Sequence, residues 1–237
     1  MDSKMFILDF FGSKKLRGTG LDIPASRFLT AYNTSQQNSF LGYFKENDAL
    51  DSEEHSGEHS EEHSDVRIKS VRKRQGIIWG KDGRHYDGKH GLLESVARTV
   101  PLLSTSSVKV FDNQNITWLG HQNPKQWNVL LSQSMFLLGL GDPLLGPSAI
   151  DAVTAGCMYI NPMYPSPFTH NDLSFTSQHP HAEETIGQPY VCSYLQNDLS
   201  SLQACVDKSM TTNLVPYTPI EFTKEAYRKR VIRIFGL

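Results

Sequence analysis

Residues 139–156 read GLGDPLLGPSAIDAVTAG and decide the fold. The run MFLLGLG at 135–141 leads into this segment and is continuously apolar, as in parallel strands covered on both faces. A glycine-rich turn follows, and Pro147 stands where the first turn of a helix is expected. The segment therefore predicts a buried strand, a tight turn and a helix over about 147–155.

The flanking sequence repeats this alternation of strand and helix. Strands are expected at QGIIWG (75–80), ITWLGHQ (116–122), CMYINP (157–162) and YVCSYL (190–195). Helices are expected at HGLLESVARTVPLL, ending near Pro101, at NPKQWNVLLSQS, with Pro124 in its first turn, and at SSLQACVDKSM. Such alternation indicates right-handed βαβ units. The predicted fold is α/β, a Rossmann-like doubly wound parallel sheet over residues 76–237, with ligands bound at the carboxyl ends of its strands.

The two ends of the chain frame this domain. Residues 1–45 are interpreted as its start, with short buried strands at 4–11 and 40–44. Residues 221–235 predict an amphipathic C-terminal helix that packs back across the domain, with its basic residues on a solvated face.

Residues 46–75 have a different composition from the rest of the chain. They change from acidic to basic and hold almost no large apolar side chains, which predicts a disordered charged insert. Within it His55, His59 and His63 repeat every four residues. A charged low-complexity loop explains these histidines better than a metal site, because the neighbouring serines and glycine disfavour a helix.

Composition and charge limit the class of protein. The chain has 237 residues, 38% of them hydrophobic, and a formal net charge of -2, which indicates a globular protein with no overall attraction to nucleic acid. No apolar run reaches the roughly 18 residues of a membrane-spanning helix, so no membrane contact is expected from this chain itself, and no signal peptide is evident. Two glycosylation sequons, at 33–35 and 115–117, weakly favour a lumenal location.

Three cysteines leave the redox compartment open. Cys157, Cys192 and Cys205 lack CxxC spacing, so they are either buried thiols or one disulfide with one cysteine left over. Cys157 opens a buried strand, and either of the other two is a candidate partner for it.

The glycine-rich turn is also the candidate binding site. Gly139, Gly141 and Gly146 allow a backbone to approach a ligand closely, and free amides near Ser148 would face a diphosphate with the helix dipole behind them. Asp151, one turn into the helix, either accepts hydrogen bonds from ribose hydroxyls or stabilises the helix dipole. Neither GxGxxG nor a P-loop is present, so nicotinamide and ATP sites are poorly supported. A nucleotide-sugar site tolerates this looser glycine pattern.

Several sequence blocks match one family in order. They are LDFFG, NSFLGYF, FLLGLGDPLLGPSAIDAVTAGCMYINP, TSQHPHAEETIGQPYV and PYTPIEFTKEAYRKRV. Through them, and outside residues 46–75, the chain resembles the α-1,6-mannosylglycoprotein 6-β-N-acetylglucosaminyltransferase family, also called N-acetylglucosaminyltransferase V. The resemblance implies the C-terminal, donor-binding half of a GT-B glycosyltransferase and an enzyme that is incomplete as given.

The activity that the resemblance implies is transfer of N-acetylglucosamine from UDP-GlcNAc to the 6-hydroxyl of α-mannose in N-glycans, in the Golgi lumen. The implied partners are UDP-GlcNAc and the N-glycan of a glycoprotein acceptor. No cofactor and no metal are expected, because amides and basic residues stabilise the leaving diphosphate in this architecture. The catalytic residues are unknown, since the family's general base belongs to an N-terminal half. The candidate donor-binding residues are Gly139, Gly141, Gly146, Pro147, Ser148, Asp151, Gln178 and His179.

Departures from the family pattern favour a second hypothesis, a non-catalytic nucleotide-sugar-binding or interaction protein. Leu145 and the shorter Asp151 stand where the family has glutamates, and a family lysine falls in the stretch shortened between His170 and Thr176. His170 or His179 are the candidate replacements for that lysine. A structural hydrogen bond to the backbone explains His179 equally well.

Overall fold

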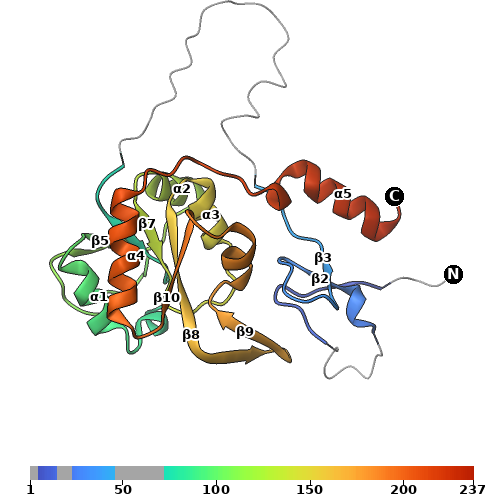
Figure 1. Cartoon of the computed structure of the whole chain (residues 1–237), viewed down its shortest axis with the longest axis horizontal. Coiled ribbons are helices and arrows are strands. Elements are labelled where there is room, and N and C mark those ends of the chain that lie inside the picture. The colour runs from blue at the N-terminus through green and yellow to red at the C-terminus, as the bar shows by residue number, and fades with distance from the viewer. Residues whose placement is uncertain (1–4, 15–22, 46–71) are drawn as a thin grey trace, which may run out of the picture.

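The computed structural model describes residues 5–14, 23–45 and 72–237, and its centre is a mostly parallel sheet between helices (Figure 1). The strand order is β10-β8-β7-β4-β5-β6, every neighbouring pair on this path is parallel, and β9 adds an antiparallel pair with β8. The strands are β4 (Gly76–Ile78), β5 (Leu102–Ser104), β6 (Ile116–Trp118), β7 (Phe136–Leu138), β8 (Met158–His170), β9 (Leu173–Ser177) and β10 (Val191–Leu195). This order confirms the predicted parallel α/β sheet.

Helices cover both faces of this sheet. α1 (His90–Ala97) and α4 (Leu199–Thr211) contact each other on one face, and α2 (Pro124–Ser132) and α3 (Ser148–Thr154) contact each other on the opposite face. Successive strand residues point to opposite faces, so Ile78 packs in the core under α1 and α4, and Ile77 in the core under α2 and α3. The doubly wound arrangement is thereby confirmed.

Local sequence explains where the helices begin. Asn123 and Gln126 form a capping box around Pro124 at the start of α2. The Asp198 carboxylate accepts hydrogen bonds from the first amides of α4. These signals place both helices within a residue or two of their expected positions.

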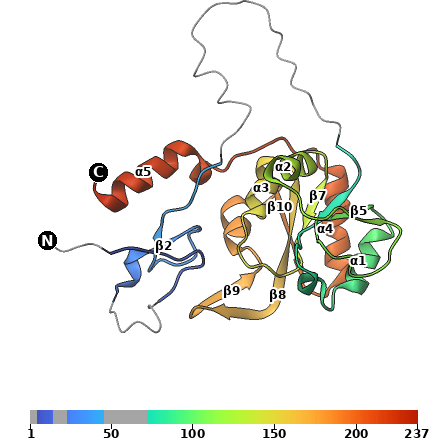
Figure 2. The ribbon, with the colours of Figure 1, turned by 180° about the vertical axis from the view of Figure 1, so that it is seen from behind.

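The N-terminal segment forms a separate small parallel sheet of β1 (Ile7–Leu8), β2 (Phe28–Thr30) and β3 (Ser39–Phe40). Figure 2 shows this sheet together with α5 (Lys224–Phe235), on the side of the molecule where the β8–β9 hairpin lies. Phe6 and Phe235 stack edge to face at 5.1 Å, and Nε of Arg230 donates to the carbonyl of Leu41 at 2.7 Å. The C-terminal helix therefore packs on the N-terminal segment, and Arg230 is buried there instead of lying on a solvated face.

A third apolar core joins this segment to the large sheet. It contains Tyr32 from the N-terminal segment and Phe222 from the 3₁₀ turn before α5, together with residues of the β7 loop, α3 and β9. The buried members are Tyr32, Leu144, Leu145, Ile150, Leu173, Phe175 and Phe222. We call this group the joining core.

Most of the predicted charged insert, with its three histidines, lies outside the described residues. The part that is described, residues 72–75, is attached to the α/β domain. The Arg72 guanidinium donates to the carbonyls of Ser134 and Ala155, and the Lys73 amide donates to that of Gln133. These four residues therefore belong with the domain.

The cysteines form one disulfide with one thiol left over. Cys192 in β10 is bonded to Cys205 in α4, and Cys157 is a buried free thiol. Burial raises the pKa of the Cys157 thiol to about 12, so it stays protonated and unreactive. Pairing of Cys157 with either of the others is therefore wrong, because β10 and α4 bring Cys192 and Cys205 together.

Within the described ranges, no helix has the length and apolar character needed to cross a membrane. Nor do the described residues bring together three or more His, Cys, Asp or Glu side chains in an arrangement that could hold a metal ion.

Candidate functional site: the loops after β4 and β7

The strand order creates a switch point between β4 and β7. From β4 the chain builds outward through β5 and β6, and then returns to the other side of β4 with β7. The loops that follow β4 and β7 therefore diverge at the carboxyl edge of the sheet, which is where open α/β sheets bind ligands. The glycine-rich segment that begins at Gly139 is one of these two loops.

Side chains from β8, from β10 and from the residues next to β9 and β10 fix the β7 loop. Four of its carbonyl groups accept hydrogen bonds: Tyr194 Oη donates to Gly139 at 3.1 Å, Gln196 Nε2 to Leu140 at 3.4 Å, Tyr164 Oη to Gly141 at 2.7 Å and Gln178 Nε2 to Pro143 at 2.9 Å. A loop held in this way requires little ordering when it binds a ligand. The β7 loop is therefore preorganised, and it lies at the carboxyl edge of the sheet.

Gln178 is the central support of this loop. Its side chain is fully buried, and its Oε1 accepts a hydrogen bond from the Gly141 amide at 3.0 Å. Its own carbonyl accepts a hydrogen bond from the Leu145 amide at 2.9 Å. The structure places Gln178 behind the loop, where it positions the backbone and has no exposed surface for direct contact with a donor.

The glycines of the loop make room for protein atoms. A Cβ on Gly139 would lie 2.3 Å from Gln178 Oε1, and a Cβ on Gly146 would lie 2.4 Å from Cζ2 of Trp79. Gly141 has φ +99°, which side-chain-bearing residues rarely adopt. The sequence suggested that these glycines admit a ligand, and the structure shows that packing and backbone conformation already require them.

Pro147 and Ser148 form the start of α3. Pro147 is exposed at the N-cap position, Ser148 is 8% exposed, and no side chain caps the helix. The first amides of any α-helix lack partners within the helix. At this end of the loop Pro147 is exposed and Ser148 is buried, and the Ile150 amide donates to the Pro147 carbonyl at 3.0 Å.

Asp151 has a structural partner that the sequence did not indicate. Its carboxylate forms an ion pair with Lys45, and its Oδ2 accepts a hydrogen bond from Nε1 of Trp127 at 3.2 Å. Asp151 thus ties α3 to α2 and to the end of the N-terminal segment. Ribose hydroxyls would have to compete with Lys45, and substitution of Asp151 is expected to affect the fold.

His179 is held by the backbone, as the second of its two sequence-based interpretations predicts. Its Nδ1 accepts a hydrogen bond from the Ala182 amide at 3.0 Å, and its ring packs on Tyr32 with centroids 4.6 Å apart. Burial, and to a smaller extent the nearby His181, lowers the pKa of His179 to about 3. The imidazole is therefore neutral at pH 7 and supplies no charge for a diphosphate. His170 packs on Phe11, with centroids 4.5 Å apart.

Leu145, at the position where the family resemblance implies a glutamate, has a buried apolar side chain. It has φ 53° and no exposed surface, and it packs in the joining core with Tyr32 and Ile150. A left-handed conformation in a residue other than glycine costs on the order of 1–3 kcal/mol. Burial of the leucine and the bond from its amide to Gln178 hold the backbone in this conformation.

The loop after β4 is the part of the site that sequence reasoning missed. Asp82 caps a 3₁₀ turn over Gly83–Tyr86, and the buried Tyr86 hydroxyl bonds with the Gly80 carbonyl at 2.9 Å and Ser104 Oγ at 2.7 Å. Its signal was the sequence Gly80-Lys81-Asp82-Gly83 directly after a strand. Nε2 of His85 lies 3.6 Å from Oδ2 of Asp142, so the two loops meet across the switch point.

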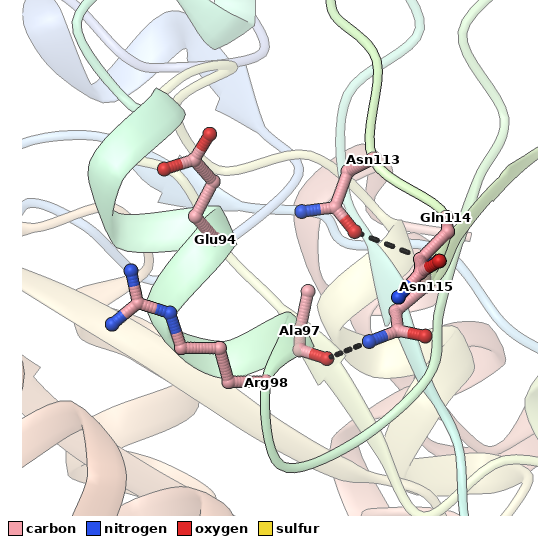
Figure 3. Close-up of a pocket in the computed structure, with 6 residues that line it drawn as sticks. All are labelled: Glu94, Ala97, Arg98, Asn113, Gln114 and Asn115. Carbon is pink, nitrogen blue, oxygen red and sulfur yellow. Dashed lines mark hydrogen bonds between the residues drawn. The ribbon is translucent and has the colours of Figure 1, made fainter.

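An open hollow of about 300 Å³ lies at the opposite edge of the sheet (Figure 3). It is lined by the end of α1 and the turn before β6, with residues Glu94, Ala97, Arg98, Asn113, Gln114 and Asn115. These segments lead into β5 and β6, so the hollow is at the amino-terminal edge. Ligands of doubly wound sheets bind at the carboxyl edge, and the β4 and β7 loops remain the better candidate.

The chain is a doubly wound α/β domain with a preorganised loop at the carboxyl edge of its sheet. Comparison with known proteins places the chain more closely: it belongs to glycosyltransferase family 18, whose sequence profile matches residues 10–235. This match confirms the family that the sequence blocks indicated.

The relatives that match the chain are named α-1,6-mannosylglycoprotein 6-β-N-acetylglucosaminyltransferases. The human α-1,6-mannosylglycoprotein 6-β-N-acetylglucosaminyltransferase A is 28% identical over 227 residues, and the human B form is 24% identical over 228 residues. The Caenorhabditis elegans α-1,6-mannosylglycoprotein 6-β-N-acetylglucosaminyltransferase is 25% identical over 232 residues. The alignments cover 89%, 89% and 90% of this chain, which spans only 29%, 27% and 32% of these relatives.

Solved structures with similar folds are more distant. The UDP-GlcNAc 2-epimerase of Methanocaldococcus jannaschii, in complex with UDP-GlcNAc and UDP, aligns with a TM-score of 0.46 at 12% identity, over 71% of this chain and 46% of that one. The calicheamicin glycosyltransferase CalG4 aligns with a TM-score of 0.38 at 13% identity, over 87% and 48%. The fold assignment follows from the strand order itself.

Proposed function

We propose that this chain binds the nucleotide-sugar donor, UDP-GlcNAc, of an N-acetylglucosaminyltransferase. The reaction is transfer of N-acetylglucosamine to the 6-hydroxyl of α-mannose in the N-glycan of a glycoprotein. The observation that carries the proposal is the family match over residues 10–235, in relatives named for this transfer. The proposed share of this chain is donor binding, and the catalytic base is assigned to none of its residues.

The geometry of the two loops supports this share. The carboxyl edge of a doubly wound sheet suits a nucleotide, and the β7 loop is fixed in advance by side chains behind it. The start of α3, which no side chain caps, follows directly on this loop. Hydrogen-bond donors that are already in place favour an anionic leaving group without reorganisation.

We also propose that the protein works in the Golgi lumen and that the transfer needs no metal ion. A disulfide between Cys192 and Cys205 fits an oxidising compartment such as the Golgi lumen. Diphosphate stabilisation by amides and side-chain donors, without a divalent cation, is the mechanism proposed for this site.

Two observations favour a second candidate, a nucleotide-sugar-binding protein without transferase activity. Leu145 is buried where the family glutamate stands, and the Asp151 carboxylate is engaged by Lys45 and Trp127. The leucine supplies no carboxylate acceptor for a ribose, and the Asp151 carboxylate already has two partners. Donor binding without transfer would favour this candidate.

Calorimetric titration of the purified chain with UDP, in the presence of EDTA, tests donor binding. We expect UDP and UDP-GlcNAc to bind. The affinity for ADP should be lower by about tenfold or more, because a site that hydrogen-bonds uracil leaves polar groups unpaired with adenine. Binding that needs added Mg²⁺ would contradict the metal-free mechanism. Absence of heat with both uridine nucleotides, confirmed by an unchanged melting temperature, would contradict the proposed function.

A further inference from the structure

The two histidines suggested by the sequence as replacements for the family lysine are engaged elsewhere in the structure. His179 is buried with its Nδ1 on the Ala182 amide, and His170 packs against Phe11. The Lys45 ammonium is paired with Asp151.

We propose that His85, on the loop after β4, donates a hydrogen bond from Nε2 to the diphosphate of the nucleotide-sugar donor across the switch point. This inference rests on the proposed function, because it assigns a residue and an atom to that same site. It also supplies a role for the loop that the sequence motifs left unassigned.

Hydrogen bonding fixes which nitrogen of His85 carries the proton. Nδ1 accepts a hydrogen bond from the Asp82 amide at 3.3 Å. In a neutral imidazole whose Nδ1 accepts, the proton is on Nε2. This Nε2 is the atom that faces the β7 loop, 3.6 Å from Oδ2 of Asp142.

The surroundings of His85 hold the ring in this direction. The side chain is only 14% exposed and lies within the capped 3₁₀ turn Gly83–Tyr86. Tyr86, the next residue, anchors the turn through Gly80 and Ser104. A donor fixed in advance loses little conformational entropy when it binds an anion.

The Asp142 carboxylate should weaken the binding of the same diphosphate. Its side chain is 70% exposed and is the anion that His85 faces in this structure. A phosphoryl oxygen that bonds with His85 would lie close to this carboxylate, and like charges at such a distance repel each other. Removing the charge of Asp142 should therefore strengthen diphosphate binding, whereas removing the imidazole of His85 should weaken it.

Calorimetry with UDP on four variants tests this assignment. We expect H85A to weaken UDP binding about tenfold or more, since hydrogen bonds to charged groups are among the strong ones. H85Q retains an N–H donor and should stay within about threefold of the unsubstituted chain. D142N should bind about two- to fivefold more tightly, because an exposed charge has a modest effect. H121A, on the loop after β6, is the matched control and should bind normally.

Uridine separates a diphosphate contact from a change in the fold. Its affinity, measured by NMR titration, should be the same for H85A and the unsubstituted chain because uridine has no phosphate. Equal UDP affinity in H85A and the unsubstituted chain, or equal losses for UDP and uridine, would overturn the role of His85 and leave the proposed function standing. If the unsubstituted chain binds neither UDP nor uridine, both proposals fail. Should H85A not fold, an unchanged UDP affinity in D142N overturns the inference.

Discussion

Replacing Tyr32 with alanine is expected to lower the free energy of unfolding by about 3–5 kcal/mol, as for other large buried aromatic residues. Tyr32 has no exposed surface and is the aromatic centre of the joining core. Its ring contacts those of Phe10, Tyr43, His179, His181 and Phe222, with centroids 4.6–6.0 Å apart. Alanine would leave a cavity between the N-terminal segment and the α/β domain.

Chemical denaturation monitored by circular dichroism measures this loss. Tyr32→Phe is the control, since it keeps the ring and removes only the hydrogen bond with the Tyr43 hydroxyl, at 3.0 Å. It should cost about 0.5–1.5 kcal/mol. An alanine variant as stable as the phenylalanine variant would show that residues 23–45 contribute little to the fold.

Replacing Gly139 with alanine is expected to destabilise the chain by about 3 kcal/mol and to abolish detectable UDP binding. Overpacking costs about 1–3 kcal/mol, and displacement of Gln178 would leave buried polar groups without partners at about 1–3 kcal/mol each. The new Cβ would also lie 2.7 Å from Cδ of Pro162 and 3.1 Å from the Ile160 carbonyl oxygen, so the loop has no free direction in which to shift.

Gly91→Ala is the matched control for this substitution. Gly91 lies in α1, and a Cβ there would meet no atom within 4 Å. Alanine favours a helix over glycine by about 0.8–1 kcal/mol, so this variant should be slightly more stable and bind UDP normally. The two variants are compared by melting temperature and by UDP titration. Normal UDP binding by Gly139→Ala would mean that the β7 loop is not the donor site.

Local sequence pattern was sufficient for the parallel core. The apolar runs at β4, β7 and β10 each determine their own strand, and Pro124 marks the first turn of α2, so these elements were predicted close to their observed bounds. β5 was missed because Leu102–Ser104 directly follows the helical pattern of α1 and is only three residues long.

β8 runs further than the sequence predicted, although prolines follow the predicted end. The sequence predicted a strand ending at Pro162, yet β8 continues through Pro165 and Pro167 to His170. Beyond Met163 the strand leaves the parallel sheet and pairs only with β9, at an exposed edge. Proline is tolerated at edges, because no neighbouring strand requires its missing amide.

The position of the glycine-rich turn was predictable, and the partners of its residues were not. The sequence predicted this turn directly after a buried strand, and in the structure it follows β7 at the carboxyl edge of the sheet. The partners of Gln178, Asp151 and His85 were beyond sequence reasoning, because each contact joins residues far apart in the chain. Asp151 meets Lys45, and His85 meets Asp142, only once the strand order has formed.

We propose that a uridine nucleotide binds at the carboxyl edge of the sheet, between the loops after β4 and β7. The most direct test is to record amide chemical shifts of the isotope-labelled chain by NMR during titration with UDP in EDTA. We predict that the largest shift changes fall in residues 79–86 and 139–148. Largest changes at residues 113–115, beside the hollow at the amino-terminal edge, or no changes at saturating UDP, would contradict the account.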